Sequence, residues 1–251
     1  MIKSGLKKRE RLDKLLVERN LAPTREKAKR FIMAGTVTVD DEKVDKSGRL
    51  VDINAKIEVA QTDRYVGRGG IKLQGALSEF KIIVEEKVVV DIGASTGGFS
   101  DCLLQHGAAK VYAIDVGYGQ LDWKLRNDAR VVVMERVNAR YLKQGDLPEE
   151  TDFATIDVSF ISLDKIIPAV KNLIVADGFI IALIKPQFEA GREKVGRGGI
   201  VRDPAVHREV INKVEEMAKR EDLTVLGLIE SPIKGADGNV EYLIHLRKGA
   251  L

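Results

Sequence analysis

The stretch VVVDIGASTGGFSDCLLQ, residues 88–105, decides the fold. Its β-branched start at 88–92 predicts a buried strand, and 98–105 predicts a helix. Between them Gly93, Gly97 and Gly98 form a glycine-rich turn, where the backbone bends sharply and approaches a ligand closely. A strand, a glycine turn and a helix in this order predict a βα unit whose ligand lies at the carboxyl end of the strand.

Further apolar runs alternate with amphipathic segments along the rest of the chain. The expected strands are 111–114, 131–134, 153–156 and 179–184, with a last strand in GNVEYLIHL at 238–246 that begins at Glu241. The expected helices, besides 98–105, are 163–173 and 204–220. Continuous apolar strands connected by helices indicate a parallel α/β sheet of Rossmann-like kind, covered on both faces.

Composition excludes several classes of protein. The 251 residues are 44% hydrophobic and 31% charged, as in a soluble globular protein. A single cysteine and three scattered histidines argue against disulfides and predict no metal site. No apolar run reaches the length of a membrane span, and the N-terminal segment lacks the apolar core of a signal peptide. We therefore expect a cytoplasmic protein and disfavour a membrane-inserted toxin.

Positive charge is concentrated at the N-terminus. The net charge is +3, but the first 30 residues alone hold eleven Lys or Arg and four Asp or Glu. A basic end on a nearly neutral protein is typical of nucleic-acid binding, although a solvated helical face would give the same pattern.

Residues 1–60 predict a small module of two short helices and a β hairpin. Leu12, Leu15 and Leu16 recur at helical spacing, Thr24 is a candidate N-cap of a second helix, and Gly35 ends it. Strands follow at 37–39 and 56–59, and residues 61–68 form a linker to a second domain at 69–251.

Residues 11–46, RLDKLLVERNLAPTREKAKRFIMAGTVTVDDEKVDK, resemble the small α+β αL-type RNA-binding domain of a ribosomal protein, pseudouridine synthases and some tRNA synthetases. The resemblance implies that the basic second helix and the hairpin bind RNA phosphates. The candidate RNA-binding residues, including one in the linker, are Arg9, Arg11, Arg25, Lys27, Lys29, Arg30 and Arg68.

The glycine turn and the following strand ends predict the cofactor. The GxxxGG spacing departs from the GxGxxG of dinucleotide sites. Asp91 suits the ammonium and sulfonium of S-adenosylmethionine, Asp115 could accept both ribose hydroxyls, and Asn138 could bond the adenine edge. NAD remains an alternative, because Asp115 would serve it equally. The candidate cofactor-binding residues are Asp91, Gly93, Ser95, Thr96, Gly97, Gly98, Phe99, Asp115, Val116, Asn138 and Asp157.

The segment after the fourth expected strand limits the kind of methyl transfer that the protein could catalyse. The sequence Asp157-Val-Ser-Phe160 lacks the prolines usual in amino-group methyltransferases. Cytosine carbon methylation needs a thiolate, and Cys102 lies in the helix after the glycine turn instead. Charged residues remain at the ends of elements, namely Lys72, Asp157, Lys185 and Glu241.

This Lys-Asp-Lys-Glu set resembles the RNA ribose 2′-O-methyltransferases of the RrmJ/FtsJ superfamily. Six segments resemble the TlyA (haemolysin A) family more specifically: VGRGGIKLQGAL (66–77), DIGASTGGFSDCLL (91–104), DVGYGQLDWKLRND (115–128), DVSFISL (157–163), LIKPQFEAGREKVGRGGIVRDP (183–204) and GNVEYL (238–243). The resemblance implies a mostly parallel seven-stranded sheet that binds S-adenosylmethionine and methylates the ribose 2′-hydroxyl of cytidine in ribosomal RNA. Members of the family are often called haemolysins.

The resemblance also implies roles for the four charged residues. A ribose hydroxyl must lose its proton as its oxygen attacks carbon, and a neutral lysine can accept that proton. Lys185 is the expected acceptor and Lys72 the cation that steadies the developing alkoxide. Asp157 would orient Lys185, and Glu241 would position Lys72 or the ribose. The glycine-rich stretch 189–199 would act as a substrate lid, and Phe160, Phe188 and Tyr118 could stack on a base.

Two other functions remain open at this stage. One is a non-catalytic RNA-binding factor for ribosome assembly that retains the fold, and the other is a haemolysin. The sequence does not reveal the modified nucleotide, the ribosomal subunit or the oligomeric state.

Overall fold

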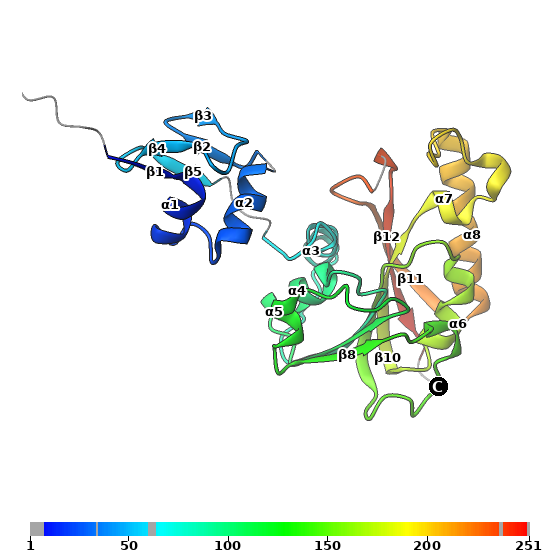
Figure 1. The fold of residues 1–251 in the computed structure, drawn as a ribbon. Coiled ribbons are helices and arrows are strands. Elements are labelled where there is room, and N and C mark those ends of the chain that lie inside the picture. Colours follow the sequence, from blue (N-terminus) through cyan, green and yellow to red (C-terminus); the bar gives the residue numbers. More distant parts are fainter. Residues whose placement is uncertain (1–7, 34, 60–63, 236–237, 250–251) are drawn as a thin grey trace, which may run out of the picture. The chain divides into compact units, whose positions relative to one another are not determined.

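The computed structural model describes residues 8–33, 35–59, 64–235 and 238–249 (Figure 1). The chain divides into two compact units, Met1–Arg64 and Tyr65–Leu251, each of which is described by itself. Tyr65, within the expected 61–68 linker, is 2% exposed and packs in the core of the second unit. Residues 61–63 of that linker lie outside the described residues.

The first unit contains the predicted helices and hairpin. Its elements in chain order are β1 (Arg9–Arg11), α1 (Leu12–Glu18), α2 (Arg25–Met33), β2 (Val37–Val39), β3 (Glu42–Lys43), β4 (Leu50–Asp52) and β5 (Ile57–Val59). As predicted, Leu12, Leu15 and Leu16 are buried, and the amide of Lys27 donates to Thr24 Oγ1 at 3.2 Å. Strands β3, β2 and β5 form one sheet in that order. Strands β1 and β4 form a separate two-stranded sheet, which the sequence does not reveal.

The second unit is built on a seven-stranded sheet in the order β11-β12-β10-β9-β6-β7-β8. Its strands are β6 (Val88–Ile92), β7 (Lys110–Asp115), β8 (Val131–Glu135), β9 (Thr151–Ile156), β10 (Ile174–Ile184), β11 (Leu223–Glu230) and β12 (Tyr242–Lys248). Strands β10, β9, β6, β7 and β8 are parallel, whereas β12 is antiparallel to both β10 and β11. This confirms the expected Rossmann-like fold class.

Helices cover both faces of this sheet (Figure 1). One face packs against α3 (Gly69–Glu79), α4 (Gly98–Gln105) and α5 (Trp123–Arg126), with Leu73, Leu103 and Leu125 in the core. The other packs against α6 (Ile167–Val170) and α8 (Pro204–Arg220), with Val170 and Val214 in the core. The remaining elements are α7 (Pro186–Glu189) and the 3₁₀ helices η1 (Ala139–Tyr141), η2 (Leu163–Lys165) and η3 (Arg192–Lys194).

Two predictions about elements are wrong. The helix expected at 163–173 is instead the 3₁₀ turn η2 followed by α6, and Pro168 occupies the first turn of α6. Proline has no N–H to donate to the carbonyl four residues earlier, so Pro168 suits the first turn of α6 but not the interior of a helix that begins at Leu163. Glu241 precedes β12 and is not its first residue, since that strand begins at Tyr242.

Candidate active site

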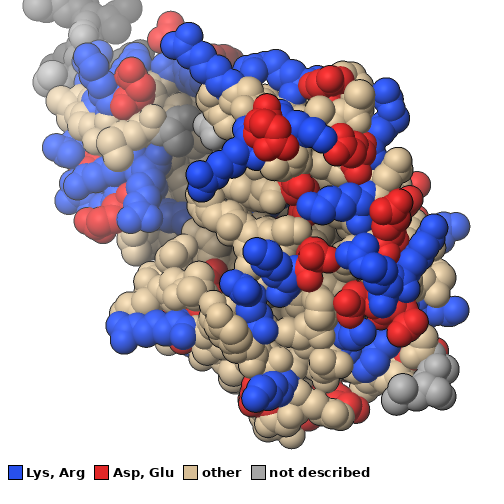
Figure 2. Space-filling view, turned by 90° about the vertical axis from the view of Figure 1, so that its right-hand side faces the viewer, with Lys and Arg blue, Asp and Glu red and all other residues tan. Residues whose placement is uncertain are grey.

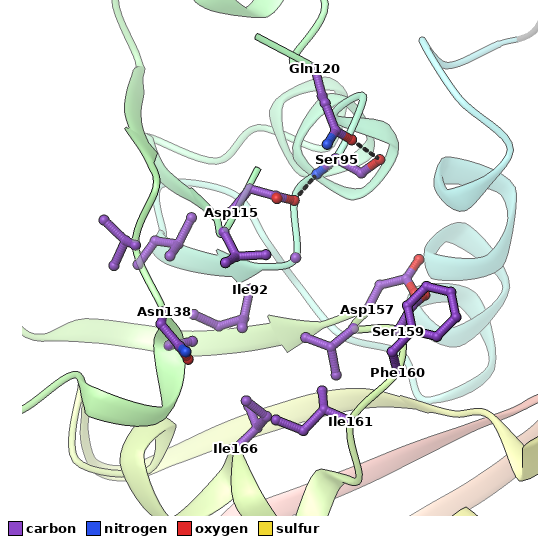
Figure 3. Close-up of a pocket in the computed structure, with 16 residues that line it drawn as sticks. Ile92, Ser95, Asp115, Gln120, Asn138, Asp157, Ser159, Phe160, Ile161 and Ile166 are labelled. Atoms are coloured by element: carbon purple, nitrogen blue, oxygen red, sulfur yellow. Dashed lines mark hydrogen bonds between the residues drawn. The ribbon is translucent and has the colours of Figure 1, made fainter. Parts of the chain in front are cut away.

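A cavity of about 440 Å³ opens where β6, β7 and β9 end (Figure 3). This is the carboxyl edge of the parallel sheet, where ligands bind in folds of this kind. The predicted residues Gly93, Ser95, Asp115, Asn138 and Asp157 all line it. Val116, also predicted, lies in its wall and is 72% exposed.

The glycine turn brings β6 against the residue that follows β9. Gly93 has a φ of +82°, a conformation that favours glycine, and a Cβ there would lie 2.4 Å from the carbonyl oxygen of Asp157. Gly97 has a φ of +96°, and a Cβ there would lie 2.1 Å from Leu125 Cδ1. Both glycines are therefore required by the geometry of the turn, as the sequence indicates.

Asp115 stands at the end of β7 and orders the turn. Its Oδ2 accepts a hydrogen bond from the amide of Ser95 at 2.7 Å, and its Oδ1 accepts one from the amide of Gly117 at 2.6 Å. Each carboxylate oxygen has a second lone pair, which can accept a hydroxyl of a ligand. Gln120, which the sequence analysis missed, also lines the cavity and accepts from the hydroxyl of Ser95 at 3.4 Å (Figure 3).

The opposite wall of the cavity is apolar. It is formed by Val137 and Ala139 after β8 and by Val158, Ile161 and Ile166 after β9. Asn138 lies between the first two, and its Oδ1 accepts from the amide of Arg140 at 3.2 Å. A flat heterocycle fits such a wall, because ring faces pack on aliphatic side chains while an amide bonds the ring edge.

A second cavity of about 210 Å³ adjoins the first through Gly93, Ser95, Asp157 and Ser159, which line both. The predicted residues Thr96, Gly98 and Phe99 line this smaller cavity, as does Lys185. The two cavities thus meet beside Asp157, at the carboxyl ends of β9 and β10.

Lys185 and Asp157 form an ion pair at this junction. Lys185 Nζ lies 2.6 Å from Asp157 Oδ1 and donates to Ser159 Oγ at 3.0 Å. Asp157 Oδ1 is buried, and the ammonium of Lys185 is its partner.

Lys72 and Glu241 form a second, more deeply buried pair. Their Nζ and Oε2 atoms are 2.6 Å apart, and the side chains are 9% and 2% exposed. Gly235 packs against Glu241 so closely that a Cβ there would lie 2.1 Å from Oε1. Each of the two candidate lysines therefore faces its own carboxylate.

Asp91 is held in the interior of the second unit. Its side chain is 0% exposed and lines neither cavity, and its oxygens accept hydroxyl hydrogen bonds from Ser100 at 2.6 Å and Thr155 at 2.9 Å. Burial, partly offset by these hydroxyls, raises the pKa of this carboxyl to about 6. Asp91 thus connects β6 to α4 and β9, and its contact with a positive ligand stays a prediction.

The candidate aromatic residues differ in their surroundings. Phe160 is 90% exposed with a φ of +64°, and its ring lies 4.9 Å from that of Phe188. Tyr118 is 67% exposed and carries the guanidinium of Arg136 over its ring at 4.3 Å. The stretch 189–199 contains η3, and the amide of Gly196 bonds the carbonyl of Ile200 at 3.0 Å. Its role as a lid stays a prediction.

In the first unit, Asp13 organises two of the predicted RNA-binding arginines. Its carboxylate is 0% exposed and accepts two hydrogen bonds at 2.9 Å from Arg11 and one at 3.0 Å from Arg25. The guanidinium of Arg11, and then that of Arg25, lowers the pKa of Asp13 to about 2. Both arginines are about half exposed, so their outer faces reach solvent.

The other predicted RNA-binding residues are on the surface or close to it. Arg9, Lys27 and Arg30 are exposed, whereas Lys29 is half-buried. Arg68 is exposed and donates to the carbonyl of Lys234. Figure 2 shows that basic and acidic side chains are interspersed over much of the face in view.

The sheet order and the site together define a methyltransferase of Rossmann-like architecture. The family profile of FtsJ-like methyltransferases matches residues 65–248, and that of the S4 domain matches residues 10–57. The chain belongs to the FtsJ-like methyltransferase family. The resemblance drawn from the sequence motifs is thereby confirmed.

Three related proteins show how much of the chain is shared. YqxC of Bacillus subtilis, named provisionally as an rRNA methyltransferase, is 55% identical over 95% of this chain and 86% of its own. The 16S/23S rRNA (cytidine-2′-O)-methyltransferase TlyA of Mycobacterium tuberculosis is 44% identical over 96% of this chain and 90% of its own. A solved structure from Streptococcus thermophilus, which carries a hemolysin name, is 47% identical with a TM-score of 0.75, covering 97% of this chain and 90% of that one.

Among the helices that the structure describes, none combines the length and the apolar character needed to cross a bilayer.

Proposed function

We propose that this protein transfers a methyl group from S-adenosylmethionine to the ribose 2′-hydroxyl of cytidine in ribosomal RNA. The observation that carries the proposal is the junction of the two cavities, where Lys185, Asp157 and Ser159 meet. The family membership and the cytidine-2′-O-methyltransferase among its relatives support the same reaction. Ribosomal RNA as substrate also favours the cytoplasm as the place of action.

The residues present fit the methyl donor. Asp115 would accept the ribose hydroxyls, and the apolar wall with Asn138 would hold the adenine. Asp157 lines both cavities, at the point where the methionine part would pass into the smaller one. When bound, S-adenosylmethionine supplies an electrophilic methyl group on a positively charged sulfur.

The chain's own residues would manage the proton of the attacking hydroxyl. Lys185 Nζ would accept that proton after passing its own ammonium proton to the paired carboxylate of Asp157, and Ser159 Oγ would hold the amine in place. The ammonium of Lys72, positioned by Glu241, would stabilise the developing alkoxide. In the first unit, Arg11, Arg25 and the second helix would bind RNA phosphates.

The test compares wild-type protein with Lys185→Ala in transfer of labelled methyl from S-adenosylmethionine to ribosomal subunits. Loss of a general base lowers the rate by about 10²–10⁴-fold, and we expect a loss in this range with donor and RNA binding retained. Lys87→Ala is the matched control, because Lys87 pairs with Asp152 at 3.0 Å at the opposite end of the sheet. Methylation by Lys185→Ala at the wild-type rate would contradict the proposed role. RNA binding without any methyl transfer by the wild type would favour an assembly factor instead.

A further inference from the structure

The loop of residues 157–163, which joins β9 to η2, forms a large part of the larger cavity's wall. Its members Asp157, Val158, Ser159, Phe160 and Ile161 all line that cavity. Phe160, in the middle of the loop, has a φ of +64°, in the left-handed region that residues other than glycine rarely adopt. Such a conformation persists only where the surroundings hold it in place.

The buried carboxylate of Glu189 is bonded to the far end of this loop. Its Oε2 accepts a hydrogen bond from Ser162 Oγ at 2.6 Å, and its Oε1 accepts one from the amide of Leu163 at 2.7 Å. Glu189 is 5% exposed, and burial raises the pKa of this carboxyl. The ammonium of Lys213 lies 3.9 Å from Glu189 Oε2. It donates its hydrogen bond instead to the backbone carbonyl of Glu189, at 3.0 Å. The carboxylate is thus used mainly to hold the loop.

Glu189 also belongs to the segment that carries Lys185. It is the last residue of α7, which begins at Pro186 directly after Lys185. The ring of Phe188 in the same short helix lies 4.9 Å from that of Phe160 in the loop. Glu189 therefore connects the segment that carries Asp157 and Ser159 with the segment that carries Lys185.

We propose that Glu189 is a positioning residue that holds the 157–163 loop in the shape required for donor binding and aligns Asp157 and Ser159 with Lys185. The inference rests on the proposed function for the identity of the donor and of the reaction. It does not require Glu189 to touch donor or RNA.

Three variants distinguish the effect of the Glu189 hydrogen bonds from the effects of its charge and its size. Glu189→Ala removes both bonds, and Ser162→Ala removes one of them from the loop side. Glu189→Gln keeps an oxygen for the Leu163 amide and an NH₂ that can donate to the Ser162 hydroxyl, so it should rescue the function. Glu216→Ala is the control, because it removes the same charge from an exposed residue of α8.

The first measurement, hydrogen exchange of the Leu163 amide in the full chain, requires no activity. We expect Glu189→Ala to exchange about tenfold faster or more, because that amide loses its charged acceptor. Glu189→Gln and Glu216→Ala should stay within about threefold of wild type, with Ser162→Ala between them and Glu189→Ala. Unchanged Leu163 exchange in Glu189→Ala would overturn the proposal.

The second measurement follows S-adenosylmethionine affinity and methyl transfer in the same variants. We expect weaker donor binding and a lower kcat in Glu189→Ala, both restored in Glu189→Gln, with an unchanged KM for RNA. Should Glu189→Ala unfold, Ser162→Ala tests the same bond with the carboxylate intact, and wild-type donor affinity there would overturn the proposal. If the wild type transfers no methyl group while Leu163 exchange responds as expected, the proposed function fails and the structural link stands.

Discussion

The buried pair of Lys72 and Glu241 gives a prediction whose size follows from the structure. The two side chains are 9% and 2% exposed with 2.6 Å between Nζ and Oε2. Removing one partner of such a pair leaves an uncompensated buried charge, which costs about 3–5 kcal/mol. Replacing both partners by apolar side chains is close to neutral, because the cost of burying two charges also disappears.

We therefore expect Glu241→Leu to lower the free energy of unfolding of the second unit by about 3–5 kcal/mol, or its Tm by about 6–20 °C. The double variant Lys72→Met/Glu241→Leu should return to within about 1 kcal/mol of wild type. If the pair also acts on the alkoxide, both variants lose methyl transfer. The double variant alone would then be as stable as the wild type and yet inactive.

The assay is urea unfolding followed by far-ultraviolet circular dichroism, since the longest helices lie in the second unit. Glu209→Gln is the matched control, because Glu209 pairs with Lys194 on the surface, where such pairs contribute about 0–1 kcal/mol. A Glu241→Leu variant as stable as the control, or a double variant as unstable as the single one, would refute the reasoning.

Three further predictions concern the donor, the RNA and acid. Asp115→Ala should weaken S-adenosylmethionine binding by about 10–100-fold in calorimetry, through loss of hydrogen bonds to a charged acceptor; unchanged affinity would contradict this. For about 3–5 phosphate contacts the slope of log RNA affinity against log salt should be roughly −2 to −4, and replacing Lys27, Lys29 and Arg30 by glutamine should reduce its magnitude by about 2; an unchanged slope would show that these three side chains do not contact phosphates. The lowered pKa of Asp13, about 2, means that its ionised form stabilises the first unit above about pH 4 and that this stability is lost as the pH falls toward 2. Acid titration of Asp13→Asn should lack that component.

Much of the second unit could be predicted from the sequence, because the spacing of its apolar residues and the residues that begin and end its helices indicate the same elements. The strand at 88–92 and the helices at 98–105 and 204–220 have the expected bounds. Asp203 caps the last helix by accepting from the amide of Ala205 at 2.8 Å, and a proline opens its first turn. Here local preference and burial favour the same structure.

Elsewhere the deciding contacts are distant in sequence. Strands β1 and β4 are three residues each, and they form only because Arg9–Arg11 meets Leu50–Asp52 across a long separation. Such short strands leave no periodic pattern. The helix expected at 163–173 breaks at Ile166, between η2 and α6, and apolar spacing alone does not show this break.

The same limit applies to the candidate site. The motifs supply Lys185 and Asp157, and the structure brings them together with Ser159. Burial is not visible in a motif, so the sequence does not show that Asp91 bonds Ser100 and Thr155. Gln120 and Glu189 depend on partners 25 and 26 residues away, and a single sequence gives no signal for such contacts.

The most direct test of the central claim is alkaline hydrolysis of ribosomal RNA that the protein has labelled with radioactive methyl from S-adenosylmethionine. A methyl group on the ribose 2′-oxygen blocks cleavage at that nucleotide, so the label should appear in an alkali-resistant dinucleotide that contains cytidine. Label recovered in single nucleotides would show methylation of a base and would contradict the account.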